Sequence, residues 1–113
     1  MSEPLNLEQL VAEAMAGLTD RERYVLEQRC GYHGDPVRQA DLAAEFNLSR
    51  TRVGRIENTA IRKMRKPHQR LMMFQQLLPT VLSRGKDDFY TRLFIKLFWL
   101  KPEHISNILN QYI

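Results

Sequence analysis

The sequence predicts an all-α protein in which a helix-turn-helix domain of about four helices is followed by a small helical C-terminal module. Three observations carry this prediction. Apolar residues recur at helical spacing, capping residues and helix-ending residues separate the segments, and two of the predicted helices are joined by a tight turn. We expect the helix-turn-helix domain to span residues 1–67 and the helical extension to span residues 68–113.

The first two helices are predicted from apolar spacing and from a capping motif. Within residues 7–18, six apolar residues recur at intervals of three and four, which predicts an amphipathic helix. Thr19 and Glu22 form a capping box, in which each side chain accepts a hydrogen bond from the backbone of the other residue. A second helix therefore begins there, and we expect it to end at Gly31, the first residue of a turn-rich loop.

The third and fourth helices form the predicted helix-turn-helix. The third helix is short, with Leu42 on its inner face, and it ends at Asn47 because asparagine tolerates left-handed dihedral angles. Ser49 then caps a longer fourth helix, which reaches about Lys66 before Pro67 interrupts it. Two helices joined by a turn this short are the unit of helix-turn-helix DNA-binding proteins, although purely structural bundles also contain them.

The charged residues are distributed unevenly along the chain. Residues 1–49 hold four basic and nine acidic side chains, whereas residues 50–70 hold eight basic side chains and one acidic side chain. Residues 71–113 hold five basic and three acidic side chains. A basic segment of this density favours a polyanionic partner such as nucleic acid; the alternative is a solvated cationic face without a partner.

The fourth helix has one apolar side and one polar side. The apolar side, which must pack on the earlier helices, carries Val53, Ile56, Ala60 and Met64. The polar side is suited to DNA, because arginine matches the acceptors of guanine, asparagine matches adenine, and a threonine methyl group can contact thymine. The DNA-binding residues that we predict on this side and at the start of the helix are Ser49, Arg50, Thr51, Arg52, Gly54, Arg55, Asn58, Arg62 and Lys63.

Two segments resemble region 4 of bacterial primary sigma factors. Residues 18–31 open with Leu-Thr-x-Arg-Glu, and residues 41–67 end with Arg-Ile-Glu followed by Ala-Ile-Arg-Lys-Met-Arg-Lys-Pro. The resemblance covers about residues 5–67. It implies a domain that binds the promoter −35 element through its last long helix and binds the β-flap of RNA polymerase through its earlier helices.

The resemblance implies four main DNA-contact positions, and this chain departs from the family at three of them. Arg50 matches the family, but Thr51 replaces a usual glutamate, Gly54 replaces a usual arginine, and Arg55 replaces a usual glutamine. The first two changes remove an acceptor for cytosine and a contact to guanine or phosphate. We therefore expect either a different DNA sequence or a protein that keeps mainly its polymerase and backbone contacts.

The helical extension is rich in apolar residues, with breaks expected at Pro79, Gly85 and Pro102. Residues 89–100 carry only three polar interruptions, and a helix that is apolar nearly all round must be buried. It packs either on its own domain or on a partner. We expect an exposed apolar strip that docks a second copy of the chain or another protein, and the residues of this strip are Phe94, Phe98 and Trp99.

The β-flap contact implied by the resemblance falls on the first two helices. On their concave side the apolar candidates are Leu10, Met15, Val25 and Leu26, although the core needs some of these residues. Tyr24 and Arg29 are the predicted surface contacts to this partner.

Other classes of function lack support in the sequence. The single cysteine excludes an internal disulfide, and Cys30 with His33 offers two ligands where a structural zinc site needs four. We find no nucleophile–base grouping and no glycine-rich phosphate loop, so we expect no enzyme, no metal and no cofactor. Without a signal peptide or a run of about 18 apolar residues, we expect a soluble cytoplasmic protein that makes no membrane contact.

The predicted function is therefore that of a sigma-region-four-like transcription factor. It would bind promoter DNA at a −35-like element together with RNA polymerase, and it would alter promoter use. One alternative is a free-standing helix-turn-helix repressor or activator that binds DNA as a dimer. The other is a mimic of the sigma domain that acts through protein–protein contacts with little DNA binding.

Overall fold

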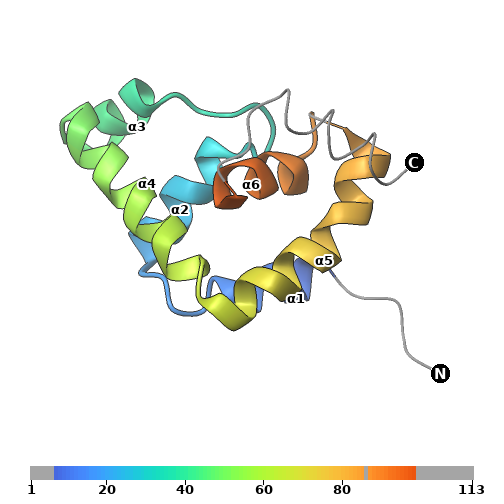
Figure 1. Cartoon of the computed structure of the whole chain (residues 1–113). Coiled ribbons are helices and arrows are strands. Elements are labelled where there is room, and N and C mark those ends of the chain that lie inside the picture. Colours follow the sequence, from blue (N-terminus) through green and yellow to red (C-terminus); the bar gives the residue numbers. More distant parts are fainter. Residues whose placement is uncertain (1–6, 86, 99–113) are drawn as a thin grey trace.

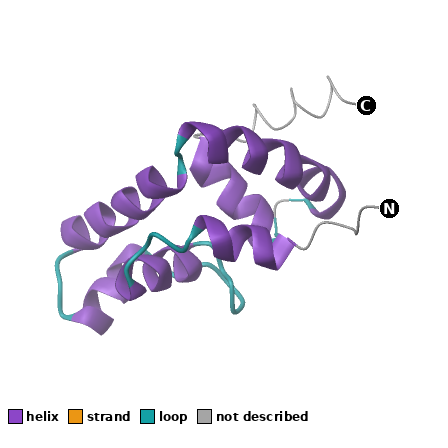
Figure 2. Ribbon diagram, turned by 90° about the horizontal axis from the view of Figure 1, so that it is seen from below, coloured by secondary structure: helices purple, strands orange, loops and turns teal. Residues whose placement is uncertain are grey.

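The structure, a computed structural model, describes residues 7–85 and 87–98, and all regular structure in these residues is helical (Figure 2). This confirms the predicted all-α class. The helices are α1 (Leu7–Ala14), α2 (Asp20–Arg29), α3 (Gln39–Phe46), α4 (Arg50–Met64), α5 (Pro67–Arg84) and α6 (Phe89–Phe98). Helix α4 packs against α2 and α3, α5 packs against α1 and α6, and α6 returns to α4 (Figure 1).

The local signals at both ends of α2 form as predicted. The Thr19 hydroxyl accepts from the backbone N–H of Glu22 at 3.1 Å, and the Glu22 carboxylate accepts from the backbone N–H of Thr19 at 2.9 Å. After Arg29 the helix is capped by Cys30, and Gly31 follows in a left-handed conformation with φ of 74°. A β-carbon at position 31 would lie 2.4 Å from the carbonyl oxygen of Gly34, so the turn requires glycine here.

The helix-turn-helix is also present with its predicted caps. Asn47 ends α3 in the left-handed region, with φ of 54° and ψ of 47°. The Ser49 hydroxyl accepts from the backbone N–H of Arg52 at 3.1 Å and so caps α4. Helix α4 ends at Met64, slightly earlier than predicted, and Pro67 begins α5 in the first turn, where its missing N–H has no intrahelical partner to lose.

The prediction that Pro79 breaks the helix is wrong, because α5 continues through it to Arg84. A proline inside a helix costs about 3 kcal/mol, since it removes a hydrogen bond and crowds the preceding turn. Buried side chains lie on both sides of Pro79, and each stabilises the protein by about 1.5–3 kcal/mol. These residues are Met73, Leu77, Leu78 and Val81. Their burial holds the helix together across the proline.

Helices α5 and α6 meet at the predicted break after Arg84. Gly85 ends α5 with φ of 77°, and Asp88 accepts from the backbone N–H of Tyr90 at 3.0 Å at the start of α6. The helix predicted to begin near Pro102 lies outside the described residues.

The hydrophobic core has two parts. The smaller part joins α2, α3 and α4 and holds the helix-turn-helix together; it consists of Val25, Leu42, Ala43 and Val53. The larger part joins α1, α2 and α4 to α5 and α6, with Met15 and Leu26 on one side and Leu77 and Phe94 on the other. The helices that follow Pro67 therefore share a core with the helices that precede it. None of the described helices is long and apolar enough to cross a membrane.

Candidate nucleic-acid interface

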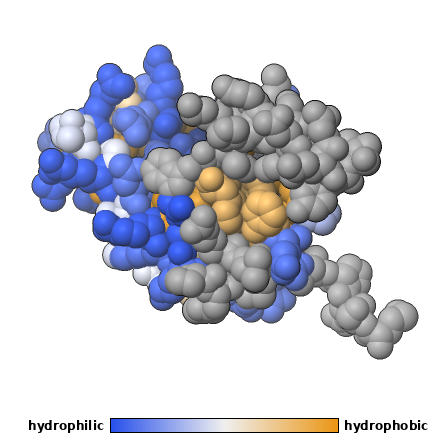
Figure 3. Space-filling model, viewed as in Figure 1, coloured by the Kyte–Doolittle hydropathy of each residue, from blue (hydrophilic) through white to orange (hydrophobic). Residues whose placement is uncertain are grey.

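The polar side of α4 lies at the surface. Its exposed residues are Arg50, Thr51, Arg52, Arg55, Asn58 and Arg62. The opposite side is in the core, where Val53, Ala60 and Met64 are buried and Ile56 is half-buried. Hydrophilic side chains gather over the end of the molecule formed by α3 and α4 (Figure 3). The structure thus presents a row of cationic and amide side chains along one face of an anchored helix.

Two residues of the predicted site are partly buried, and one of these is already ion-paired. The Lys63 ammonium donates to the Glu22 carboxylate at 2.7 Å. This hydrogen bond, together with the bond from the Thr19 backbone, lowers the pKa of Glu22. The second residue, Gly54, faces α3, where a β-carbon at position 54 would lie 3.6 Å from the amide nitrogen of Gln39. Gln39 therefore lies beside the position where the family has an arginine.

A shallow hollow separates the N-terminal ends of α3 and α4. It is lined by Arg29, Arg38, Gln39, Ala40 and Arg50. Arg38 is the N-cap of α3 and forms no side-chain cap, so no side chain at this position satisfies the first N–H groups of the helix. Arg38 and Arg50 are exposed beside the helix N-terminus and are the kind of donors that bind phosphate oxygens, but Arg38 also pairs with Asp41 at 3.2 Å and Arg29 is held by Glu57. The chemistry of this hollow therefore suits an anion.

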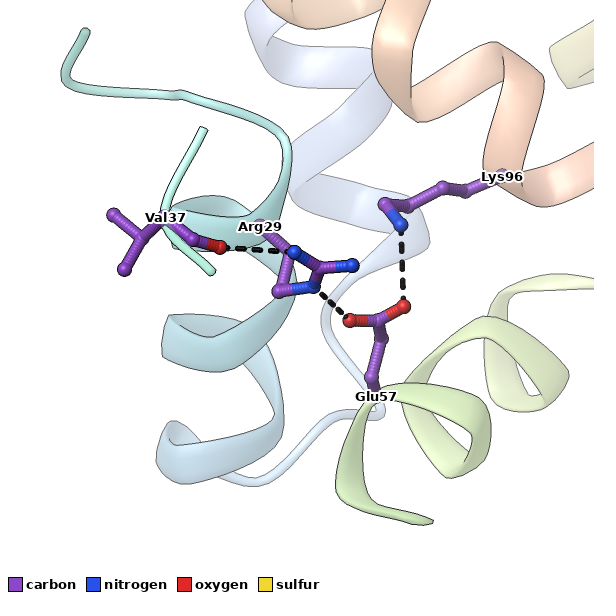
Figure 4. Close-up of polar contacts among 4 residues, drawn as sticks. All are labelled: Arg29, Val37, Glu57 and Lys96. Carbon is purple, nitrogen blue, oxygen red and sulfur yellow. Dashed lines mark hydrogen bonds and ion pairs between the residues drawn. The ribbon is translucent and has the colours of Figure 1, made fainter. Parts of the chain in front are cut away.

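Behind the polar face, a buried carboxylate connects three helices (Figure 4). Arg29 of α2 donates to Glu57 of α4 at 2.5 Å, and Lys96 of α6 donates to the other carboxylate oxygen at 3.1 Å. Arg29 also donates to the carbonyl oxygen of Val37 at 3.0 Å. Burial alone raises the pKa of Glu57, but the charges and hydrogen bonds of Lys96 and Arg29 outweigh burial and hold this pKa below its usual value.

This ion cluster was not predicted from the sequence. Glu57 is the single acidic residue in the basic segment 50–70, and its position falls between Val53 and Ala60 on the apolar side of the helix. An acidic residue inside an apolar stripe is the signal that could have revealed it. Lys96, its second partner, lies 39 residues away in the chain, so no local pattern could have identified that contact.

Comparison with known proteins agrees with this geometry. The family model described as "Sigma-70, region 4" matches residues 14–66. Residues 14–66 of this chain are therefore similar to sigma-70 region 4. We call this segment the region 4 domain.

The curated relatives match the same part of the chain. "RNA polymerase sigma factor RpoH" of Caulobacter vibrioides is 46% identical over 57 residues, which are 50% of this chain and 19% of that protein. "RNA polymerase sigma-C factor" of a Nostoc species is 38% identical over 66 residues, which are 58% of this chain and 16% of that protein. The aligned part thus spans about a fifth of the length of these relatives. No solved structure gave a significant match. The family and these names support a sigma-factor-like role in transcription.

The residues predicted to bind partners lie in varied environments. The Tyr24 hydroxyl donates to Glu45 at 2.6 Å, and Arg29 is part of the ion cluster with only 23% of its side chain exposed. Phe94 is completely buried, so the expectation that it lies on an exposed strip is wrong. The reason is that α6 folds back onto the region 4 domain. Phe98 is partly buried and its ring contacts that of Phe94 at 4.8 Å between centroids, while Trp99 lies outside the described residues.

Cys30 belongs to the core rather than to a reactive site. It is buried at the end of α2, and burial raises the pKa of its thiol to about 12. Among the described residues, no group of three or more His, Cys, Asp or Glu side chains could hold a metal ion.

Proposed function

We propose that this chain is a sigma-region-four-like transcription factor whose helix α4 enters the major groove of promoter DNA at a −35-like element. The observation that carries the proposal is the exposed row of arginine, threonine and asparagine side chains along α4, in a segment that matches the sigma-70 region 4 family. Helix-turn-helix proteins place this second helix in the major groove, with its N-terminal residues next to the base edges.

The side chains of α4 divide into two roles by their position. Arg55 and Asn58 lie on the middle of the exposed face, where a bidentate donor would contact guanine and an amide would contact adenine. Arg50 and Arg52 flank the start of the helix and Arg62 lies near its end, so we assign these three residues to phosphates. The exposed Arg38, which lines the hollow beside Arg50, would contact a further phosphate.

The departures from the family indicate a different DNA sequence. Thr51 lacks the carboxylate with which a glutamate accepts from cytosine, and Gly54 contributes no side chain to the groove. Gln39, beside Gly54, is the nearest polar group that could occupy the vacated space. We therefore propose that the preferred sequence differs from that of the primary sigma factors at the base pairs these positions would contact.

We further propose that the region 4 domain contacts the β-flap of RNA polymerase and thereby changes promoter use. The family resemblance supports this partner, as do the relatives, which are named as RNA polymerase sigma factors. The surface that would be used lies on α1 and α2.

The test of DNA binding starts with duplexes selected from a random library by the wild-type chain. Arg55→Ala should weaken binding to the selected duplex by about 1–3 kcal/mol, or roughly 5- to 150-fold, and should relax the preference at one base pair. Arg23→Ala is the matched control, because Arg23 is exposed on α2 and pairs only with Glu27 of its own helix among the contacts described. If Arg55→Ala binds the selected duplex as tightly as Arg23→Ala does, α4 does not contact bases through this residue.

A further inference from the structure

The apolar surface predicted to contact the polymerase is occupied in this structure by the chain's own C-terminal helices. Leu10, Met15 and Leu26 were the flap-contact candidates on α1 and α2 that belong to the larger core. They are 8%, 2% and 0% exposed, and the same cluster contains Leu93, Phe94 and Leu97 of α6 together with four buried residues of α5. The fourth candidate, Val25, is buried in the smaller core within the helix-turn-helix.

We infer that α5 and α6 are an intramolecular mask, which holds the polymerase-binding face of the region 4 domain closed until an apolar segment of the polymerase displaces α6. This inference rests on the proposed function. In physical terms, the β-flap and α6 would compete for one apolar surface, so the exchange would bury a new apolar segment in place of the old one.

Three contacts attach α6 to the region 4 domain besides its apolar side chains. Lys96 pairs with Glu57 at 3.1 Å, and Arg92 donates to the carbonyl oxygen of Cys30 at 3.4 Å. The ring of Phe89 meets the ring of Tyr32 edge-on, with 4.9 Å between centroids. These contacts lie at the two ends and the middle of α6, so the helix is held along its length.

The ion cluster keeps the electrostatic cost of releasing α6 small. When Lys96 leaves, Glu57 keeps its hydrogen bond from Arg29, so no buried carboxylate is left without a cation (Figure 4). The Lys96 and Arg92 side chains are already 23% and 20% exposed, which lowers the cost of leaving. The joint between α5 and α6 includes Gly85, whose positive φ ends α5 and separates it from α6.

The mask and the DNA-binding face lie on different sides of α4. Glu57, Ala60 and Ile61 face the core, whereas Arg55, Asn58 and Arg62 are exposed. Release of α6 would therefore uncover its share of this apolar core without changing the surface that contacts DNA. DNA binding and polymerase binding can therefore be measured independently of each other.

The test compares the full-length wild-type chain with Lys96→Glu, which places a second carboxylate beside Glu57 and so weakens the docking of α6. Lys66→Glu is the control with the same change of charge at an exposed site outside α1, α2 and α6. We expect Lys96→Glu to bind core RNA polymerase at least fivefold more tightly than Lys66→Glu does, while Lys96→Glu and the wild type agree within twofold in their affinity for DNA. Hydrogen exchange supplies a second measurement on the wild type: amides in residues 89–98 should exchange faster in the polymerase complex than in the free chain.

The outcomes separate this inference from the proposed function. If polymerase binds the wild type while residues 89–98 stay protected, or if Lys96→Glu gains no affinity over its control, the mask is overturned and the polymerase contact stands. If neither the wild type nor Lys96→Glu binds polymerase, the proposed polymerase contact fails and the mask fails with it. DNA binding is measured separately and is unaffected by either result.

Discussion

Glu57→Gln tests the ion cluster that joins α2, α4 and α6. The substitution keeps the shape of the side chain but removes the charge shared by Arg29 and Lys96. Removing one partner of a fully buried ion pair costs about 3–5 kcal/mol. Here Glu57 has 8% of its side chain exposed, whereas both cations are 23% exposed and can be partly hydrated after the change. We therefore expect a loss of about 2–3 kcal/mol in the free energy of unfolding at pH 7.

The expected loss is a large part of the stability of a chain of 113 residues, which for typical proteins is about 5–15 kcal/mol. Urea unfolding followed by far-UV circular dichroism measures it. Glu13→Gln is the control, because Glu13 is exposed on α1 and its substitution should change stability by less than about 0.5 kcal/mol.

The pH dependence of the free energy of unfolding provides a second test of the same substitution. Because the folded state lowers the pKa of Glu57, the ionised carboxylate stabilises the fold above the ordinary glutamate pKa of about 4.3. That contribution disappears as the pH falls through the lowered pKa of the folded state. The difference between the wild type and Glu57→Gln should therefore narrow below about pH 4.3. A stability at pH 7 within 0.5 kcal/mol of the wild type, or a difference that does not change with pH, would refute the role assigned to the cluster.

Four further predictions follow from single contacts. Thr19→Ala should lower stability by about 1 kcal/mol in urea, because it removes the side-chain half of the capping box; an unchanged midpoint would mean that the box contributes nothing. Gly54→Ala should raise stability by up to about 1 kcal/mol, because alanine favours helix and the added carbon meets only ordinary contacts; a lower midpoint would show a clash. The thiol of Cys30, buried and with a pKa of about 12, should react with a thiol reagent only as fast as the chain opens, and fast labelling of the folded protein would place it at the surface. Arg62→Ala should weaken binding to all DNA sequences by a similar factor, and a loss confined to one sequence would assign Arg62 to a base.

Local signals predicted the helix-turn-helix accurately because the residues that decide it are close in sequence. The hydroxyls of Thr19 and Ser49 bond to backbone groups three residues away, and Asn47 ends α3 through its own dihedral angles. The two faces of α4 likewise follow from helical periodicity alone, so the exposed candidate site could be predicted by residue number.

The packing of the C-terminal helices could not be predicted in this way. Whether an apolar helix covers its own domain or a partner depends on contacts between distant residues, such as Lys96 with Glu57. The same long-range burial keeps α5 helical through Pro79, where local rules predict a break. The sequence therefore predicts Phe94 on an exposed strip, although the fold places it in the core.

The binding of DNA by the exposed face of α4 is tested most directly by the salt dependence of affinity for the selected duplex. Arg50, Arg52 and Arg62, with Arg38 of the adjoining hollow, would neutralise about four phosphates. The logarithm of the association constant should then fall against the logarithm of salt concentration with a slope of about −3 to −4. A slope near zero, or no measurable affinity for any duplex at low salt, would contradict the assignment of α4 as a DNA-binding helix.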